Sequence, residues 1–317
     1  MYAKITGTGS YLPAHQMDNI ELSKSVDTSD EWIQSRTGIK ARHIAEHDTV
    51  VSMSVHAAKE AIRDAKLSPA EIDLVIVSSV SAEQVLPCVA CEVQAAIGAV
   101  HAASFDLNAA CTGFITAYQM AVAQMKAGLI RTALVIGAEC LSNLIDWTDR
   151  STCILFGDGA GAAVITCESS EIEVPFILHS DGTKGQVLSC SSGFGKGKSP
   201  YGKYVFMDGR EIYKFAVKKV PELICEILEK ENCSADEIDR FLLHQANKRI
   251  ILSIAKHLHQ DISKFPMNLQ ENGNMSSASI PVLLDDLNRR GELKPGMKLI
   301  VAGFGAGLTW GGMYLEW

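Results

Sequence analysis

The chain has 317 residues, 47% of them hydrophobic and 21% charged, and its 29 basic side chains against 37 acidic ones leave a formal net charge of −8. This composition is that of an ordinary globular protein, which excludes disordered, collagenous and coiled-coil chains. At about 150 residues per domain, the length predicts two domains. A net negative chain is poorly suited to nucleic acid unless its basic side chains gather in one patch.

The sequence indicates a cytoplasmic protein without a metal site. Its first residues lack the basic start and apolar run of a secretory signal. The uncharged stretch 107–125 contains Asn, Thr and Gln, whereas a membrane-spanning helix needs about 20 mostly apolar residues, so we interpret it as buried core. Nine scattered cysteines fit a reducing compartment. Cys88 and Cys91 form a CxxC pair, but the second pair that a zinc site needs is missing.

The sequence repeats itself at an offset of about 166 residues. Residues 67–77 read LSPAEIDLVIV, and residues 233–243 read CSADEIDRFLL. Residues 132–139, TALVIGAE, match residues 297–305, MKLIVAGFG, at nearly the same offset. In each case a helical pattern precedes a hydrophobic strand. Two matches at one offset predict that the chain consists of two similar halves.

The alternation of helical and strand patterns predicts an α/β fold. Short runs rich in Val, Ile and Leu are typical of parallel strands buried on both faces. The segment 111–130 is apolar nearly all round, which indicates a helix buried inside the protein. We therefore expect two α/β halves, 1–170 and 171–317, with mixed, largely parallel sheets packed around buried helices.

Cys111 lies in the segment DLNAACTGF, after a short predicted strand and at the start of the apolar helix. A helix N-terminus offers unpaired N–H groups and a partial positive charge, which stabilise a thiolate and lower the pKa of a cysteine. Small neighbouring residues leave room for a substrate carbonyl. The position fits a cysteine nucleophile, although position alone favours the alternative of a buried, inert cysteine.

Two further polar residues follow predicted core elements. His244 comes directly after the predicted strand 240–243, and α/β folds place active residues at the carboxyl ends of strands. Asn274 lies in a turn of small and polar residues before the helical pattern PVLLDDLNRR. A histidine satisfied within the core, and an asparagine that caps a helix or forms a turn, are the alternatives to catalytic roles.

Two glycine-rich segments invite comparison with ligand-binding loops. Residues 157–161 approach the GxGxxG pattern of dinucleotide-binding proteins, which requires a helix to follow. The next residues, AAVIT, predict a strand, so we expect a tight turn and no nicotinamide cofactor. Residues 303–312 predict a second turn between strands, whose backbone amides could bind an oxyanion.

Seven motifs are distributed along the whole chain: GTGSYLP (7–13), DTSDEWIQSRTGIKARH (27–43), DLNAACTGF (106–114), DWTDRSTCILFGDGAGA (146–162), HQANKRI (244–250), NGNMSSASIP (272–281) and GFGAGLTWG (303–311). In sequence, order and spacing they resemble the β-ketoacyl-acyl carrier protein synthase III family, whose members initiate type II fatty acid synthesis. The resemblance implies a thiolase fold with five layers, two repeated halves and a homodimer. The internal repeat agrees with that fold independently.

The resemblance implies a catalytic triad of Cys111, His244 and Asn274. In the implied ping-pong reaction, the Cys111 thiolate attacks the thioester of a short acyl-coenzyme A, with acetyl-coenzyme A expected first, and coenzyme A leaves. Malonyl-acyl carrier protein then loses carbon dioxide while His244 and Asn274 donate hydrogen bonds to the enolate oxygen. The resulting carbanion attacks the acyl-cysteine and gives a 3-oxoacyl-acyl carrier protein. Coenzyme A is therefore part of a substrate, and no cofactor or metal is expected.

The same resemblance assigns roles to residues around the triad. The residues expected to contact coenzyme A are Thr28, Trp32, Arg36, Arg150 and Asn247. The residues expected beside the triad, with an amide for the oxyanion hole, are Phe304, Gly305 and Gly307. The basic residues expected to bind the acidic carrier protein are Lys214, Arg249 and Lys256.

The resemblance also implies a primer pocket that the partner subunit closes. Its expected walls are Leu86, Leu141, Phe156 and Leu188. The family pattern at the closing loop is a large residue, a proline and a small hydroxyl residue, whereas this chain has Leu86, Pro87 and Cys88. Leu86 is smaller than a phenylalanine at this position, so the pocket has room for a slightly longer primer. We therefore expect acetyl as the preferred primer, with tolerance for slightly longer or branched chains.

Two other functions remain compatible with the sequence. A same-fold enzyme of secondary metabolism would keep the triad and change the primer or the acceptor. A thioesterase or non-condensing acyltransferase would need Cys111 but not the role of Asn274. Release of carbon dioxide from malonyl-acyl carrier protein separates a condensing enzyme from the second group.

Overall fold

A computed structural model of the chain describes residues 3–167, 176–192 and 202–317. The first of two main sheets has the strand order β1-β7-β6-β4-β5. Its strands are β1 (Lys4–Tyr11), β4 (Leu74–Ser78), β5 (Ala103–Leu107), β6 (Thr132–Glu139) and β7 (Gly159–Thr166). Strand β4 pairs in parallel with β5 and β6, while β7 is antiparallel to β6 and β1.

The second main sheet has the order β11-β12-β13-β8. Its strands are β8 (Phe176–Ser180), β11 (Arg240–Leu243), β12 (Lys298–Gly305) and β13 (Thr309–Glu316). Here β11 and β12 are parallel, and the other two pairs are antiparallel. Both sheets are therefore mixed, with more antiparallel pairing than the sequence alone indicates. A strand rather than a helix occupies the region around residues 157–161, as expected, but β7 begins at Gly159, so Gly159 and Gly161 lie within the strand and not in a turn before it. Residues 303–312 form the β12–β13 turn with the strand ends that flank it.

The internal repeat is visible in local structure. A short 3-10 helix precedes each of the equivalent strands β4 and β11, at Pro69–Glu71 and at Ala235–Glu237, and each has the same serine–glutamate capping box. A second pair of 3-10 turns opens the buried helices, and each contains a left-handed residue, Ala110 with φ 46° and Ser276 with φ 45°. The expected boundary between halves, at 170/171, lies outside the described residues.

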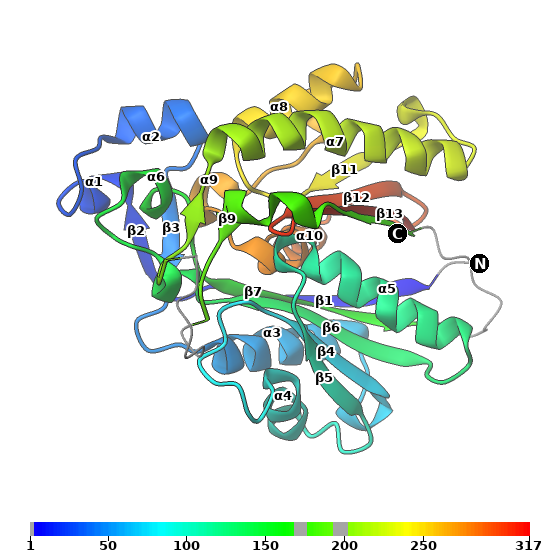
Figure 1. Cartoon of the computed structure of the whole chain (residues 1–317). Coiled ribbons are helices and arrows are strands. Elements are labelled where there is room, and N and C mark those ends of the chain that lie inside the picture. Colours follow the sequence, from blue (N-terminus) through cyan, green and yellow to red (C-terminus); the bar gives the residue numbers. More distant parts are fainter. Residues whose placement is uncertain (1–2, 168–175, 193–201) are drawn as a thin grey trace.

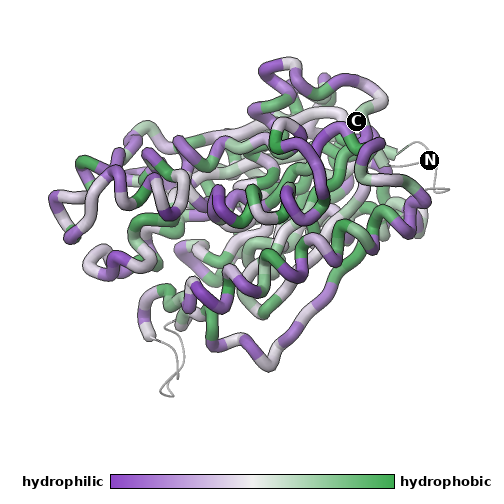
Figure 2. The backbone as a smooth tube through the Cα atoms, turned by 90° about the horizontal axis from the view of Figure 1, so that it is seen from above, coloured by the Kyte–Doolittle hydropathy of each residue, from purple (hydrophilic) through white to green (hydrophobic). Residues whose placement is uncertain are grey.

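Five layers stack helix, sheet, helix, sheet, helix (Figure 1). Helices α5 (Gly113–Lys126) and α10 (Ser279–Arg289) lie between the sheets and share one apolar core with both. Helices α3 (Val50–Ala65) and α4 (Val89–Ile97) cover the outer face of the first sheet. Helices α7 (Gly209–Lys230) and α8 (Lys248–His257) cover the second. Hydrophobic residues accordingly concentrate inside the molecule (Figure 2).

Smaller elements surround the edges of these layers. Short helices are α1 (Asn19–Leu22), α2 (Asp30–Thr37), α6 (Arg150–Cys153) and α9 (Leu269–Asn272), and two small sheets pair β2 (His15–Asp18) with β3 (Ala41–Ile44) and β9 (Leu188–Ser189) with β10 (Phe206–Met207). The buried stretch around 107–125 forms the end of β5 and most of α5. Within the described ranges, every helix is too short or too polar to cross a bilayer.

Candidate active site

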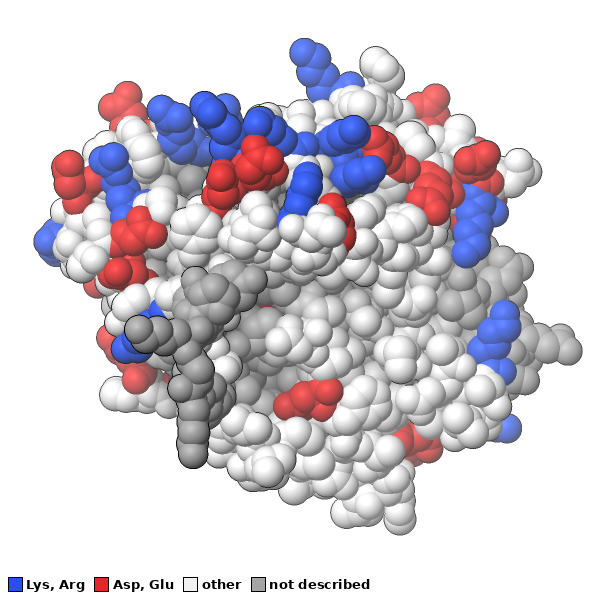
Figure 3. Space-filling view, in the orientation of Figure 1, with Lys and Arg blue, Asp and Glu red and all other residues white. Residues whose placement is uncertain are grey.

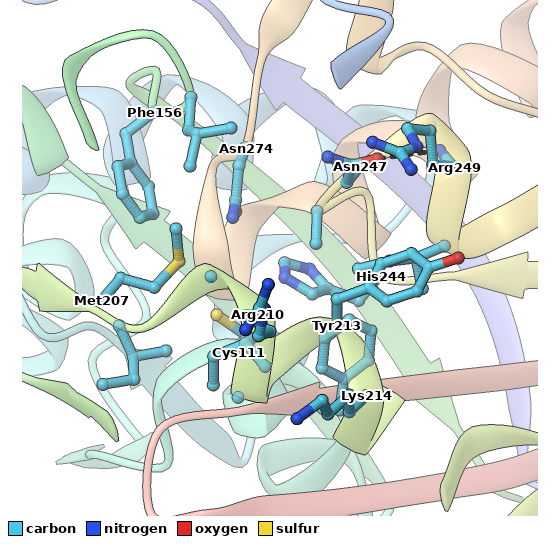
Figure 4. Close-up of a pocket in the computed structure, with 18 of the residues that line it drawn as sticks. Cys111, Phe156, Met207, Arg210, Tyr213, Lys214, His244, Asn247, Arg249 and Asn274 are labelled. Carbon is cyan, nitrogen blue, oxygen red and sulfur yellow. Dashed lines mark hydrogen bonds between the residues drawn. The ribbon is translucent and has the colours of Figure 1, made fainter. Parts of the chain in front are cut away.

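A cavity of about 600 Å³ extends from the surface between α7 and α8 to the buried end of α5. Cys111, His244 and Asn274 all line it. The remaining lining residues come from both halves of the chain: Arg36, Leu155, Phe156, Leu188, Met207, Gly209, Arg210, Ile212, Tyr213, Lys214, Ala246, Asn247, Arg249, Ile250, Phe304 and Gly305. The three residues expected to form the triad therefore meet at one cavity, as Figure 4 shows.

Cys111 sits in the 3-10 turn Ala110–Thr112, directly before α5. Its side chain is buried, and its Sγ donates to the Ser276 hydroxyl at 3.4 Å. Burial, together with the charge of Glu139, raises the pKa of the Cys111 thiol to about 12. The expectation that the helix N-terminus lowers this pKa is wrong for the free enzyme, because the loss of hydration outweighs the helix. The resting thiol is protonated.

His244 follows β11, and its amide donates to the Ala302 carbonyl of β12 at 2.8 Å. The ring packs edge-on against Phe304, with centroids 5.5 Å apart. Burial lowers the pKa of His244 to about 3, so the imidazole is neutral near pH 7. Its Nδ1 lies 2.7 Å from the Ser279 hydroxyl, which donates to the Ser276 carbonyl at 2.9 Å. In this arrangement Nδ1 carries the hydrogen, and rotation of the Ser279 hydroxyl would stabilise the other tautomer.

Asn274 is held by backbone and side-chain hydrogen bonds. Its amide donates to the Leu155 carbonyl at 2.8 Å, and its carbonyl accepts from the Gly157 amide at 3.1 Å. The side-chain Oδ1 accepts from the Ser276 amide at 2.9 Å. Because Oδ1 is engaged, the Nδ2 group is the free donor, and Figure 4 shows it pointing into the cavity above Cys111 and His244.

The β12 strand passes directly beside the nucleophile. A Cβ at Gly305 would lie 2.8 Å from the Cys111 Cβ and 3.2 Å from its Sγ, so only glycine allows this approach. Phe304 is buried next to His244. Gly307 has φ 141° in the β12–β13 turn, and it is absent from the residues that line the cavity.

The expected coenzyme A contacts lie on α2, α6 and the start of α8. Arg150 and Arg36 both contact the Trp32 ring, with their Cζ atoms 4.8 Å and 5.6 Å from its centroid. Asn247 caps α8, and its Nδ2 donates to the Arg36 carbonyl at 3.2 Å. Of these residues only Arg36 and Asn247 line the cavity. The Thr28 hydroxyl nearby is buried without a hydrogen-bond partner.

Basic side chains surround the cavity entrance. Lys214 and Arg249 line it, Lys214 pairing with Glu211 at 2.8 Å and Arg249 lying 5.8 Å from the Tyr213 ring centroid. Lys256 is exposed further along α8, away from the cavity. Figure 3 shows Lys and Arg side chains in a band along this top edge, interspersed with acidic ones.

The four expected primer-pocket residues separate into two pairs. Phe156 and Leu188 line the cavity. Leu141 is buried in the neighbouring apolar cluster and does not line the cavity. Leu86 is 83% exposed and does not line the cavity of this chain. Cys88 and Cys91 have their sulfurs 3.3 Å apart, and no His, Cys, Asp and Glu group suited to a metal occurs in the described part of the chain.

Three polar residues of this site escaped the sequence analysis: Ser276, Ser279 and Glu139. Ser276 contacts Cys111 and Asn274, and Ser279 contacts His244. Glu139 is fully buried at the end of β6. The repeat carried a signal for the first of them, because Ser276 lies 166 positions after Ala110, beside the counterpart of Cys111.

Comparisons with known proteins agree on one family. Family models match residues 105–182, described as 3-oxoacyl-[acyl-carrier-protein] synthase III, and residues 228–317, described as the C-terminal part of the same protein. The chain is 47% identical to the β-ketoacyl-[acyl-carrier-protein] synthase III of Clostridium acetobutylicum, over 99% of this chain and 98% of the relative.

Solved structures give the same result. The 3-oxoacyl-[acyl-carrier-protein] synthase III of Aquifex aeolicus is 42% identical, with a TM-score of 0.94 over 99% of this chain and all of that chain. The priming β-ketosynthase of the R1128 polyketide pathway is 36% identical, with a TM-score of 0.94 over 99% and 96%. The fold is that of the thiolase-like condensing enzymes, which are acyltransferases. Within that class, the chain belongs to the 3-oxoacyl-[acyl-carrier-protein] synthase III family.

Proposed function

We propose that this chain condenses a short acyl-coenzyme A with malonyl-acyl carrier protein, through an acyl-Cys111 intermediate, in the first elongation step of type II fatty acid synthesis. The observation that carries the proposal is the meeting of Cys111, His244 and Asn274 at one cavity in a chain of this family. Acetyl-coenzyme A is the expected primer.

In the first half-reaction, the Cys111 thiolate attacks the primer thioester. Loss of the thiol proton is the demanding step, because burial raises the pKa of this group to about 12. Once formed, the thiolate lies at the N-terminus of α5, whose partial positive charge stabilises it. A Cβ at Gly305 would lie 3.0 Å from the Cys111 amide nitrogen, so the Gly305 backbone lies beside that amide, and the two amides are the candidates to hold the developing oxyanion.

In the second half-reaction, malonyl-acyl carrier protein loses carbon dioxide. The Asn274 Nδ2 donates to the enolate oxygen, since Oδ1 is already bound by Ser276. The neutral His244 donates from Nε2 when the Ser279 hydroxyl turns to donate to Nδ1. The carbanion then attacks the acyl group on Cys111 and releases the thiolate.

The cavity entrance suits both substrates. The adenine of coenzyme A would stack on Trp32 near Arg36 and Asn247, with Arg150 on its other face. At 4.8 Å the Arg150–Trp32 contact leaves no room for a ring between them, because two stacking contacts need about 3.5 Å each. We therefore infer that Arg150 moves when coenzyme A binds. Basic Lys214 and Arg249 would attract the acidic carrier protein.

We also propose a homodimer. Leu86 and Val85 are 83% and 62% exposed on the loop before α4, and no described strand pairs with the outer side of the adjacent edge strand β5. Charged side chains are sparse on the lower part of the face in Figure 3. A second copy would cover this surface and bring Leu86 to the partner's primer pocket. Sedimentation and the primer profile of Leu86→Phe test the two parts separately.

The proposed enzyme needs no cofactor or metal, and we place it in the cytoplasm. The nine cysteines all lie in the described ranges and form no disulfide bond there, which fits a reducing compartment.

The deciding experiment divides the reaction into halves. Cys111→Ala should abolish transfer of radiolabelled acetyl groups from acetyl-coenzyme A to the protein. His244→Ala and Asn274→Ala should each lower carbon dioxide release from malonyl-acyl carrier protein by about 10²–10³-fold and reduce acylation less. Equal loss of both activities in the last two variants would contradict this division of labour.

The similarity to a polyketide-priming synthase favours one alternative, an enzyme that primes a secondary pathway with another acyl group. Mass spectrometry of the acyl group bound to Cys111 after purification from cells distinguishes the two. An acetyl adduct supports fatty acid initiation, and a longer or branched adduct supports the alternative.

A further inference from the structure

Glu139 is a buried carboxylate without a role in the reaction described above. It lies at the end of β6 and accepts hydrogen bonds from the Val80 amide at 3.0 Å, the Ser81 hydroxyl at 2.5 Å and the Ser277 hydroxyl at 2.7 Å. The groups that lower its pKa are hydroxyls and a backbone amide, with no basic side chain among them. Burial raises the pKa of Glu139, so the site can take up a proton.

Ser276 interacts with both the nucleophile and this carboxylate. The Cys111 thiol donates to the Ser276 hydroxyl at 3.4 Å, and the Ser276 side chain also acts by hydrogen bonding on the pKa of Glu139. The Ser276 backbone is fixed, because its amide donates to Asn274 and its carbonyl accepts from Ser279. Only the hydroxyl is free to turn, and a hydroxyl can accept one hydrogen bond while donating another.

We propose that Ser276 and Glu139 form the proton path of Cys111, in which the Ser276 hydroxyl accepts the thiol proton and passes its own proton to the Glu139 carboxylate. This inference rests on the proposed function and names the acceptor that its first half-reaction requires. Ser276 touches the reacting sulfur, whereas Glu139 acts through Ser276.

Charge favours this path over transfer to His244. A proton that moves from Cys111 to His244 would create a thiolate and an imidazolium in a buried site, although burial strongly disfavours the charged imidazole. A proton that moves to Glu139 creates no additional charge, because it transfers one negative charge from carboxylate to sulfur. It also removes the repulsion by which Glu139 raises the pKa of Cys111.

The proton balance closes over a full cycle. Cys111 S–H and the Glu139 carboxylate become a thiolate and a carboxylic acid, with Ser276 unchanged. The thiolate forms the new C–S bond to the acyl group, and coenzyme A leaves as a thiolate that takes a proton from water. In condensation the C–S bond to Cys111 breaks, and the released thiolate recovers the proton of Glu139 through Ser276. One solvent proton is consumed per turnover, as decarboxylation of a malonyl carboxylate requires.

Other ionisable groups near Glu139 are few. The Cys111 thiol and the adjacent Cys140 thiol face it, and Asp158 and Glu83 act on Cys140. Burial raises the pKa of both Cys140 and Asp158. His244 lies on the cavity side of Cys111 and is neutral across the range of the test.

The test is the pH dependence of acylation in a single turnover with acetyl-coenzyme A. In the wild type the proton stays inside the protein, so we expect a nearly flat rate between about pH 6 and pH 8.5. In Glu139→Gln and Ser276→Ala the proton must leave to solvent, so the rate should rise about tenfold per pH unit and lie about 10²-fold below wild type near pH 7. Iodoacetamide alkylation of Cys111 should show the same slopes.

The matched control is Ser277→Ala, which removes a hydrogen bond to the same carboxylate without touching Cys111 and should keep the flat profile. Malonyl decarboxylation by each variant reports whether the fold survives, and Ser276→Ala carries the test alone if Glu139→Gln does not fold. A merely electrostatic Glu139 predicts the opposite result, faster alkylation in Glu139→Gln at every pH. That outcome, or parallel profiles for wild type and both variants, overturns the path. A wild type that forms no acyl-enzyme overturns the proposed function instead.

Discussion

Replacing Gly305 with alanine should displace the nucleophile. The added Cβ would lie 2.8 Å from the Cys111 Cβ, 3.0 Å from its amide nitrogen and 3.2 Å from its Sγ. Non-bonded carbons prefer about 3.5–4.0 Å, so the carbon–carbon contact is short by about 0.7 Å or more. Relief of this contact must move Cys111 or β12. Because a misplacement of about 1 Å can cost about 10²-fold, we expect acylation to slow by about 10- to 100-fold.

The control for Gly305→Ala is Gly303→Ala on the same strand. Its Cβ would lie 3.2 Å from the Cys111 carbonyl oxygen and 3.2 Å from the Ile115 Cδ1, and away from the sulfur. Overpacking should cost each variant about 1–3 kcal/mol of stability. Acylation followed by mass spectrometry and thermal melting separate the effects. If Gly305→Ala acylates as fast as Gly303→Ala, the close approach of β12 does not position Cys111.

Three other changes test the surroundings of the site. Trp32→Ala should raise the KM for acyl-coenzyme A about tenfold or more, since a base stacked on an aromatic ring contributes about 1–3 kcal/mol. Condensation by enzyme that is already acylated should not change. Lys214→Glu and Arg249→Glu should weaken use of malonyl-acyl carrier protein more than use of acetyl-coenzyme A, and added salt should mimic the effect; equal losses would place docking elsewhere. Burial lowers the pKa of His244 to about 3, against about 6.5 in an unfolded chain. Between these two pH values the unfolded chain binds one more proton than the folded chain. The stability of the fold therefore falls as the pH drops from about 6.5 to about 3. His244→Gln should therefore flatten the fall in the urea midpoint between about pH 6.5 and pH 4.5, and an unchanged fall would mean that His244 is charged in the folded chain.

Most of the fold could be predicted from the sequence, because the hydrophobic periodicity of each segment and the internal repeat can both be recognised without a structure. The runs 74–78, 132–139 and 240–243 form the strands that hydrophobic patterning predicts, and the segment after Cys111 forms a helix between the sheets. The share of strand pairs that are parallel could not be predicted in the same way. It depends on β1, β7, β8 and β13, whose antiparallel partners are set by the return path of the chain and not by their composition.

The motifs identified three residues that meet at one cavity, whereas their supporting contacts and protonation states could not be predicted. A sequence shows that Cys111 precedes a helix, but the pKa depends on how completely the surrounding chain excludes water, and here burial reverses the expected direction. In the sequence Glu139 is an ordinary strand-end residue, and only the fold brings its charge close enough to affect the pKa of Cys111. Leu86 is exposed on the single chain, so its expected contact with the primer rests on the proposed homodimer.

The paired left-handed turns of the repeat bear on how such an enzyme could arise. Ser277 stands where Cys111 stands in the first half, Ser78 where His244 stands in the second, and Asn108 corresponds to Asn274, each 166 positions apart. The Ser277 hydroxyl now lies 2.7 Å from Glu139 and 3.0 Å from the Ser78 carbonyl, and the Ser78 hydroxyl is buried without a hydrogen-bond partner. Gene duplication could have produced an ancestor with two equivalent active sites. Loss of the nucleophile from one of them would leave serines at the positions equivalent to Cys111 and His244. In the remaining site, Cys111 comes from the first half of the chain, and His244 and Asn274 come from the second. Neither half alone therefore contains all three of these groups.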